Sequence, residues 1–332
     1  MLCFSLCLCA LMPPYLCAVP APARHAPLDG YSLPDGLQDW LTIDTPHFRI
    51  HYTAKDRYFS RELTALSEES CARVTNYLDL YPAKKITIYL ACSRELFIRL
   101  QPYPSAVSEQ AIGLAYPSLS RMVLLSPRAA SAGSIQLEKT FIHELTHIIL
   151  GSSFFSTTPL SIPQWFNEGL SMHIAEEWDW RYEALMTRIC ISRTLIPLRQ
   201  LEYSFPADPD RLQTAYAQSI SMISFISETY GQDSLKEITR LLLQGNTIDQ
   251  ALNKAIGMDL DKLETRWRKR LRLLYTWVPI LTSSALLWFI ISLIFLMVYY
   301  RKRRMSLAKI SEWEEDDIEE WLKEQLDDLD EL

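Results

Sequence analysis

The stretch His143-Glu144-Leu145-Thr146-His147, followed by Asn167-Glu168-Gly169, decides the fold prediction for this chain of 332 residues. The first five residues match the pattern H-E-x-x-H. Residues four positions apart on a helix share a face, so both imidazoles can bind one metal ion and fill two corners of a tetrahedral zinc site. Glu144 lies about 100° further round the helix. From there it can act as a general base on a metal-activated water.

The limits of this helix are also predicted. Ser134 can cap its start and Gly151 can end it, which gives a helix over Ile135–Leu150. A loop rich in Ser, Thr and Pro follows, and a second helix begins near Pro163. The loop permits an antiparallel return of the chain, so the second helix is expected to face the first.

Glu168 on the second helix is the candidate for a third metal ligand. Its neighbours Trp165, Phe166 and Leu170 are apolar. A carboxylate among apolar side chains needs a partner, which disfavours the alternative of an exposed helix glutamate. Three protein ligands leave one open position for water. The pattern therefore predicts one Zn²⁺ per chain, held by His143, His147 and Glu168.

The two motifs together resemble the gluzincin zinc metallopeptidases, and most closely the bacterial peptidase MA-like domain family. The resemblance covers about residues 44–272. It extends to an opening strand, to a helical segment and to two closing helices, namely Thr45–Ile50, Ala215–Ser219, Ala255–Gly257 and Leu263–Trp267. The resemblance implies an α+β, thermolysin-like zincin domain. In such a domain a mixed sheet packs on the H-E-x-x-H helix and a helical lobe follows.

The resemblance also implies the reaction, which is zinc-dependent hydrolysis of a peptide or protein substrate with Glu144 as general base. An edge strand would hold the extended substrate by main-chain bonds, and residues 113–115 and 122–125 are the candidates. Gluzincins usually add a Tyr or His that donates to the oxyanion. Tyr216 could take this role, and a packing tyrosine is an equally good interpretation. A catalytically weak domain of the same fold, acting as a membrane-tethered binding or assembly module, is the alternative function.

The residues that would orient the ligands are less well defined by the sequence. Some relatives place a carboxylate four positions after the glutamate ligand, where this chain has Met172. His173 could support the site from behind. Glu176 and Glu177 are interpreted as a solvated helix face.

A long uncharged segment predicts a single membrane span after the domain. No charged residue occurs from Leu273 to Tyr300. After Pro279, about 21 residues remain, which as a helix measure roughly 31 Å and match a bilayer core. The run Arg301-Lys302-Arg303-Arg304 follows directly, as expected of a stop-transfer signal. A transmembrane helix over 276–300 is therefore predicted, and a buried core helix is the disfavoured alternative.

The N-terminal residues predict export of the domain. Residues 1–23 are mostly apolar and end in an A-x-A pattern, which indicates a signal peptide. No Lys or Arg precedes the apolar run, which departs from a usual signal peptide. A short N-terminal anchor is the alternative. With the signal, residues 24–43 form a linker and residues 44–275 the extracytoplasmic peptidase domain of a single-pass cell-membrane protein. Residues 301–332 then form a basic stop-transfer segment and a cytoplasmic tail.

The charge is concentrated in that tail. Residues 311–332 hold twelve acidic residues and one lysine, whereas the whole chain has a net charge of −7. The remainder is only mildly basic, so nucleic-acid binding is not expected. The acidic tail could dock a basic cytoplasmic partner, and a solvated acidic helix or a disordered tail is the simpler interpretation.

Overall fold

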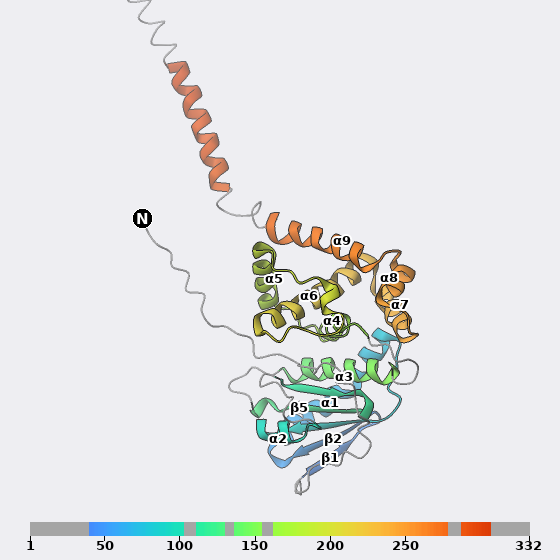
Figure 1. The fold of residues 1–332 in the computed structure, drawn as a ribbon. Helices are drawn as coiled ribbons and strands as arrows, with labels where there is room; N and C mark the ends of the chain where they lie inside the picture. Colours follow the sequence, from blue (N-terminus) through green and yellow to red (C-terminus); the bar gives the residue numbers. More distant parts are fainter. Residues whose placement is uncertain (1–39, 103–110, 130–135, 155–161, 278–286, 307–332) are drawn as a thin grey trace, which may run out of the picture. The chain divides into compact units, whose positions relative to one another are not determined.

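The computed structural model describes residues 40–102, 111–129, 136–154, 162–277 and 287–306 (Figure 1). The chain divides into two compact units, Met1–Leu271 and Arg272–Leu332. The predicted signal peptide, most of the linker, the acidic tail after residue 306 and the predicted helix cap Ser134 lie outside the described residues.

Among the described residues of the first unit, five strands form one mixed sheet in the order β1-β2-β3-β5-β4. The strands β2, β3 and β5 run parallel, whereas β1 and β4 are antiparallel to their neighbours. The strand bounds are Trp40–Asp44 for β1, Phe48–Thr53 for β2, Ile86–Ala91 for β3, Gly113–Tyr116 for β4 and Arg121–Leu125 for β5. Of the two candidates for a substrate-binding edge strand, this order makes β4 an edge strand, as β1 is at the other side of the sheet. The second candidate, residues 122–125, is wrong, because β5 pairs on both of its sides.

Side-chain alternation separates the two faces of the sheet. Phe48, Ile50 and Tyr52 are buried on one face of β2, where helices α1 (Arg57–Leu78) and α3 (Leu137–Phe154) pack. The rings of Phe48 and Phe141 lie 5.5 Å apart and tie α3 to this face. The short helix α2 (Arg94–Arg99) covers part of the opposite face, over β3 and β5.

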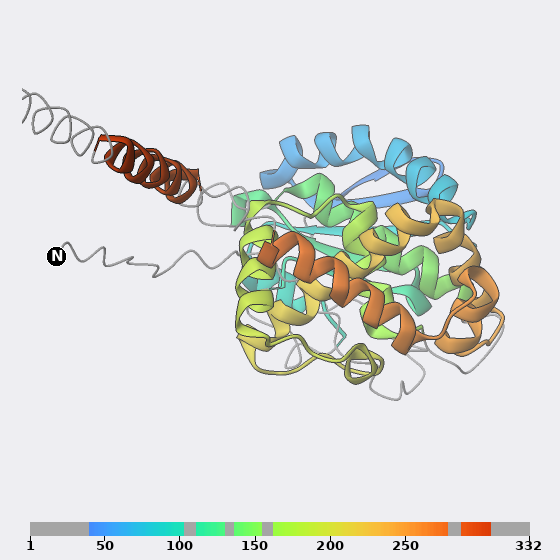
Figure 2. The same ribbon diagram turned by 90° about the horizontal axis from the view of Figure 1, so that it is seen from above.

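A helical lobe follows α3, and Figure 1 shows α3 between the sheet and this lobe. Figure 2 gives the same arrangement from above, with α1 beside α3. The lobe consists of α4 (Gln164–Ile174), α5 (Trp180–Ser192), α6 (Pro209–Tyr230), α7 (Gln232–Leu243), α8 (Ile248–Ile256) and α9 (Leu260–Arg272). The central helix α6 packs on α4, α5 and α7. The predictions of an α+β fold, a mixed sheet on the H-E-x-x-H helix and a following helical lobe are confirmed.

The prediction that Gly151 ends the active-site helix is wrong, because α3 continues to Phe154. A Cβ atom at position 151 would lie 2.4 Å from the Cβ of Pro117, in the connection between β4 and β5. Glycine is therefore needed here for close packing of the connection on the helix. Its role as a helix stop applies only where the backbone turns into the left-handed region.

The second unit contains a π-helical turn, Leu273–Trp277, and a helix over residues 287–306. The side chains from Leu287 to Tyr300 on this helix are exposed. Within the described ranges, no helix is both long enough and apolar enough to cross a membrane. Residues 278–286 of the predicted span lie outside those ranges.

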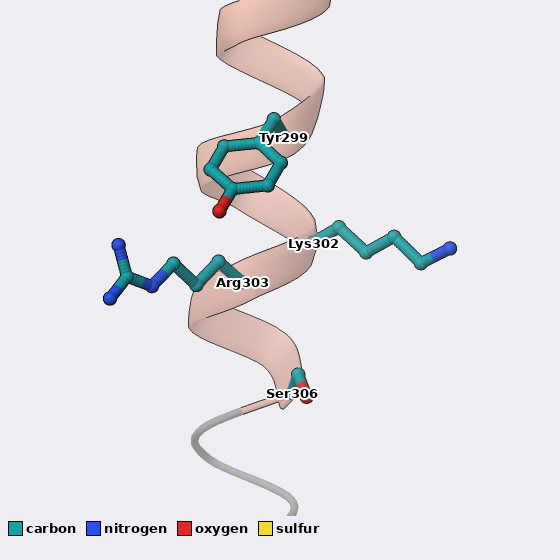
Figure 3. A pocket seen from close by; sticks show the side chains of 4 residues that line it. All are labelled: Tyr299, Lys302, Arg303 and Ser306. Atoms are coloured by element: carbon teal, nitrogen blue, oxygen red, sulfur yellow. The ribbon is translucent and has the colours of Figure 1, made fainter.

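A pocket on the same helix is lined by Tyr299, Lys302, Arg303 and Ser306, whose side chains are drawn in Figure 3. Its lining has two cationic groups and no carboxylate or imidazole. The pocket therefore lacks the side chains that usually bind a metal ion.

Candidate metal centre

Three buried side chains meet between α3 and α4. The Nε2 atoms of His143 and His147 lie 3.0 Å apart, and each lies 3.7 Å from Oε2 of Glu168. Ligands at about 2.0–2.1 Å from a tetrahedral zinc ion are separated by roughly 3.3 Å. The three donor atoms therefore fit around one ion. No other group of three His, Cys, Asp or Glu side chains in the described residues is arranged to hold a metal.

The charge of the cluster also favours a cation. Glu168 is fully buried, and neither of its carboxylate oxygens has a hydrogen-bond partner among the described residues. Burial raises the pKa of Glu168, but the positive charge of His147 and His143 outweighs it and lowers the pKa to about 2. Two imidazolium rings with Nε2 atoms 3.0 Å apart would repel each other. A bound metal ion would supply the positive charge with both imidazoles neutral.

The other nitrogen of each imidazole contacts an oxygen atom. Nδ1 of His143 lies 2.8 Å from Oε1 of Glu177. Nδ1 of His147 lies 3.2 Å from Oδ1 of Asn167 and 3.3 Å from Oγ of Ser171. When Nδ1 carries the proton and donates a hydrogen bond to these oxygens, the lone pair of each Nε2 points to the centre of the cluster. This is the usual arrangement behind metal-binding histidines.

The backbone at the end of α4 explains how Glu177 reaches His143. Glu176 has a positive φ of 54°. The N–H of Glu177 donates to the carbonyl of Met172 at 3.0 Å, and the N–H of Glu176 donates to the carbonyl of His173 at 3.2 Å. These two bonds form a Schellman motif, which turns the chain back at the end of the helix. The side chain of Glu177 thus returns to α3.

The interpretation of Glu177 as part of a solvated face is wrong, because its side chain is 19% exposed and contacts His143. The carboxylate behind the ligand comes from position 177, whereas Met172 is buried in an apolar cluster. His173 contacts Ser224 of α6 and the ring of Tyr77 on α1, and so packs between helices. The sequence did contain a signal for this orienting carboxylate, namely an acidic residue just after the helix that carries Glu168.

Replacing Glu177 by alanine is expected to weaken zinc binding by about 10- to 100-fold, because His143 loses the acceptor that orients its ring. Competition with a chromophoric chelator would measure the affinity. The matched control is Glu176→Ala, since the Glu176 side chain is 76% exposed and lies next to Glu177. Equal zinc affinities of the two variants would contradict the orienting role.

Close helix packing places the glutamate ligand. A Cβ atom at Gly169 would lie 2.5 Å from the carbonyl oxygen of Ser219 on α6. The absence of a side chain at Gly169 lets α4 approach the backbone of α6. Glu168 directly precedes this contact. The glycine of the Asn-Glu-Gly motif therefore helps to fix the position of the Glu168 carboxylate between the helices.

Glu144 and Tyr216, the two residues predicted for catalysis, are both buried. Glu144 lies on α3 beside His143, and its carboxylate faces Gly113 of β4. Tyr216 lies on α6 in the apolar cluster with Met172 and packs edge-to-face on Phe205, with ring centroids 5.0 Å apart. The catalytic role of Tyr216 stays a prediction.

Known proteins resemble this chain over part of its length. The uncharacterized protein YhcO of Bacillus subtilis (strain 168) is 27% identical over 138 residues, which cover 40% of this chain and 41% of that protein. An aminopeptidase N family protein from Idiomarina loihiensis is 15% identical with a TM-score of 0.42, over 69% of this chain and 46% of that one. A two-domain M1 zinc metallopeptidase bound to L-tryptophan is 11% identical with a TM-score of 0.41, over 69% and 50%. The chain spans about half or less of each relative.

A family comparison covers more of the chain. Residues 68–273 match the family described as the Peptidase MA superfamily. This segment is more than half of the chain, and it contains the H-E-x-x-H motif and Glu168. The chain belongs to the Peptidase MA superfamily.

Proposed function

We propose that this chain is a zinc-dependent metallopeptidase that hydrolyses peptide bonds. In this proposal His143, His147 and Glu168 are the zinc ligands, and Glu144 is the general base. The observation that carries the proposal is the convergence of three buried donor atoms, from α3 and α4, beside the buried carboxylate of Glu144 on α3. Buried ionisable groups are concentrated at functional sites, and Glu144 is buried next to the candidate ligand His143 on α3.

The reaction assigns one task to each group. Zinc, when bound, supplies a Lewis acid that acidifies water and polarises the substrate carbonyl. Glu144 accepts the proton of the attacking water and donates a proton to the leaving amine. Tyr216 donates a hydrogen bond to the oxygen that becomes negative, and β4 aligns an extended peptide along its edge.

The membrane anchor is a second part of the proposal and rests on the uncharged segment before Arg301. Residues 276–300 cross the cell membrane once, after a signal peptide over residues 1–23. The domain over 44–275 then acts outside the cytoplasm. The acidic tail within 301–332 lies in the cytoplasm, where it is available to a basic partner.

Zinc dependence of hydrolysis tests the proposed function. The full-length chain, purified in detergent, is expected to contain about one zinc ion per molecule and to cleave members of a peptide library. Removal of zinc by EDTA is expected to abolish cleavage, and added Zn²⁺ to restore it. Mass spectrometry of the products and metal analysis are the measurements.

The outcomes separate the proposal from its alternative. A folded chain that binds zinc but cleaves no peptide would favour the binding or assembly module. A folded chain that binds no zinc at neutral pH would contradict both the ligand set and the reaction.

A further inference from the structure

We propose that Gly113 is a positioning residue for Glu144, so that glycine at this place in the edge strand keeps the carboxylate of the base in its working position. This inference rests on the proposed function. It gives the edge strand β4, which aligns the substrate in the proposed function, a second role at the site.

The contact between β4 and α3 is unusually close at Gly113. A Cβ atom there would lie 2.6 Å from Oε1 and 2.8 Å from Cγ of Glu144, and 2.9 Å from Cγ2 of Thr140. Thr140 and Glu144 are four residues apart on α3 and so share the face that meets the strand. The glycine Cα therefore fits between these two side chains.

Both backbones at this contact are firmly held. Gly113 pairs with Leu124 in the register of β4 and β5, and the neighbouring carbonyl of Ile112 accepts from the N–H of Leu125 at 2.8 Å. On the helix side, Phe141 and Leu145 are fully buried in the core. Neither the strand nor the helix can withdraw without breaking these contacts.

The glutamate side chain is then the part that yields to an added methyl group. Because Cγ as well as Oε1 lies within the clash distance, a rotation of the terminal carboxylate alone does not relieve the contact. The whole side chain must take another rotamer, which moves the carboxylate away from its place. Misplacement of a catalytic group by about 1 Å can cost on the order of 100-fold in rate.

Gly113→Ala in the full-length chain tests this role. We expect kcat to fall by about 10- to 100-fold, while KM changes by less than about 3-fold and zinc content stays near one per chain. The value of kcat is calculated per folded, zinc-containing molecule. A substitution that only loosened the fold would lower the number of such molecules but would leave this kcat unchanged.

Gly151→Ala is the matched control. It adds the same methyl group at a crowded contact of α3, against Pro117, and not at Glu144. This variant is expected to lose thermal stability but to keep the kcat of the folded wild-type chain. A wild-type kcat in Gly113→Ala, beside an active wild-type chain, would overturn the inference and leave the proposed function intact.

A second measurement does not depend on hydrolysis. The decrease in Tm caused by Gly113→Ala is compared in two backgrounds, Thr140→Ser alone and Thr140→Ser with Glu144→Ala. Thr140→Ser removes the competing Cγ2 contact from both. Non-additivity shows that two positions are energetically coupled. We expect the decrease to be at least halved when Glu144 is truncated.

An equal decrease in Tm in both backgrounds would overturn the inference, because the added methyl group would then not meet the glutamate. A wild-type chain without hydrolytic activity would also overturn it, since there would be no base to position. This second outcome would be seen in the wild-type chain alone, and it would show that the proposed function, on which the inference rests, is wrong.

Discussion

Replacing Glu144 by glutamine is expected to lower kcat for peptide hydrolysis by about 10²- to 10⁴-fold, with zinc content unchanged. The amide has nearly the shape of the carboxylate but cannot accept a proton from water. Glu144 is outside the His143, His147 and Glu168 cluster, so the metal site keeps all of its donors. Steady-state kinetics on a peptide identified in the library, with metal analysis of the same sample, would measure both quantities.

Glu138→Gln is the matched control for this prediction. Glu138 stands in the first turn of the same helix and is exposed. The substitution changes the same charge on α3 without touching the site, and full activity is expected. If Glu144→Gln retained the activity of Glu138→Gln, another group would have to act as the base.

Replacing Glu168 by alanine is expected to remove the metal ion. The variant loses one of three protein donors, and with it the anionic group that balances the charge of the cation. We expect the zinc affinity to fall by more than the roughly 10- to 100-fold typical of residues that only orient a ligand. Hydrolysis is lost together with the ion. Equilibrium dialysis against buffered zinc would measure the affinity.

The variant Glu168→Asp distinguishes loss of the ligand from loss of the fold. It keeps the carboxylate but retracts it by one methylene group from Nε2 of both histidines, which lie 3.7 Å from Glu168. Its zinc affinity is expected to fall between the wild-type and alanine values. Full zinc occupancy of a folded Glu168→Ala chain would exclude Glu168 as a ligand.

Two neighbouring features of the active-site helix show where sequence reasoning was sufficient and where it was not. The spacing of His143 and His147 needs only the helical repeat, and the structure brings their Nε2 atoms to 3.0 Å. Gly151 was interpreted by the same local rules as a helix stop. The need for a glycine here comes from close packing on Pro117, which is 34 residues away in the chain and meets the helix only after folding.

The orienting groups show the same division. Asn167 belongs to the Asn-Glu-Gly motif, but its contact with His147 depends on how α4 lies against α3. Glu177 follows the end of α4, and a left-handed residue turns it back toward His143. Nothing in a run of two glutamates predicts which of them faces solvent, because the backbone turn between them decides it.

The sequence by itself determined the active-site helix, the pairing of His143 with His147 and the candidate ligand Glu168. These follow from helical periodicity and from the cost of burying a carboxylate, which are properties of short segments. The α+β class was predicted from the resemblance that these motifs carry. The tertiary structure decided that β4, and not β5, is an edge strand, that Glu177 lies behind His143 and that Gly113 contacts Glu144. These three features depend on the strand order and on contacts between segments that are far apart in the chain. They are selected by packing energies, which cannot be read from a local sequence pattern.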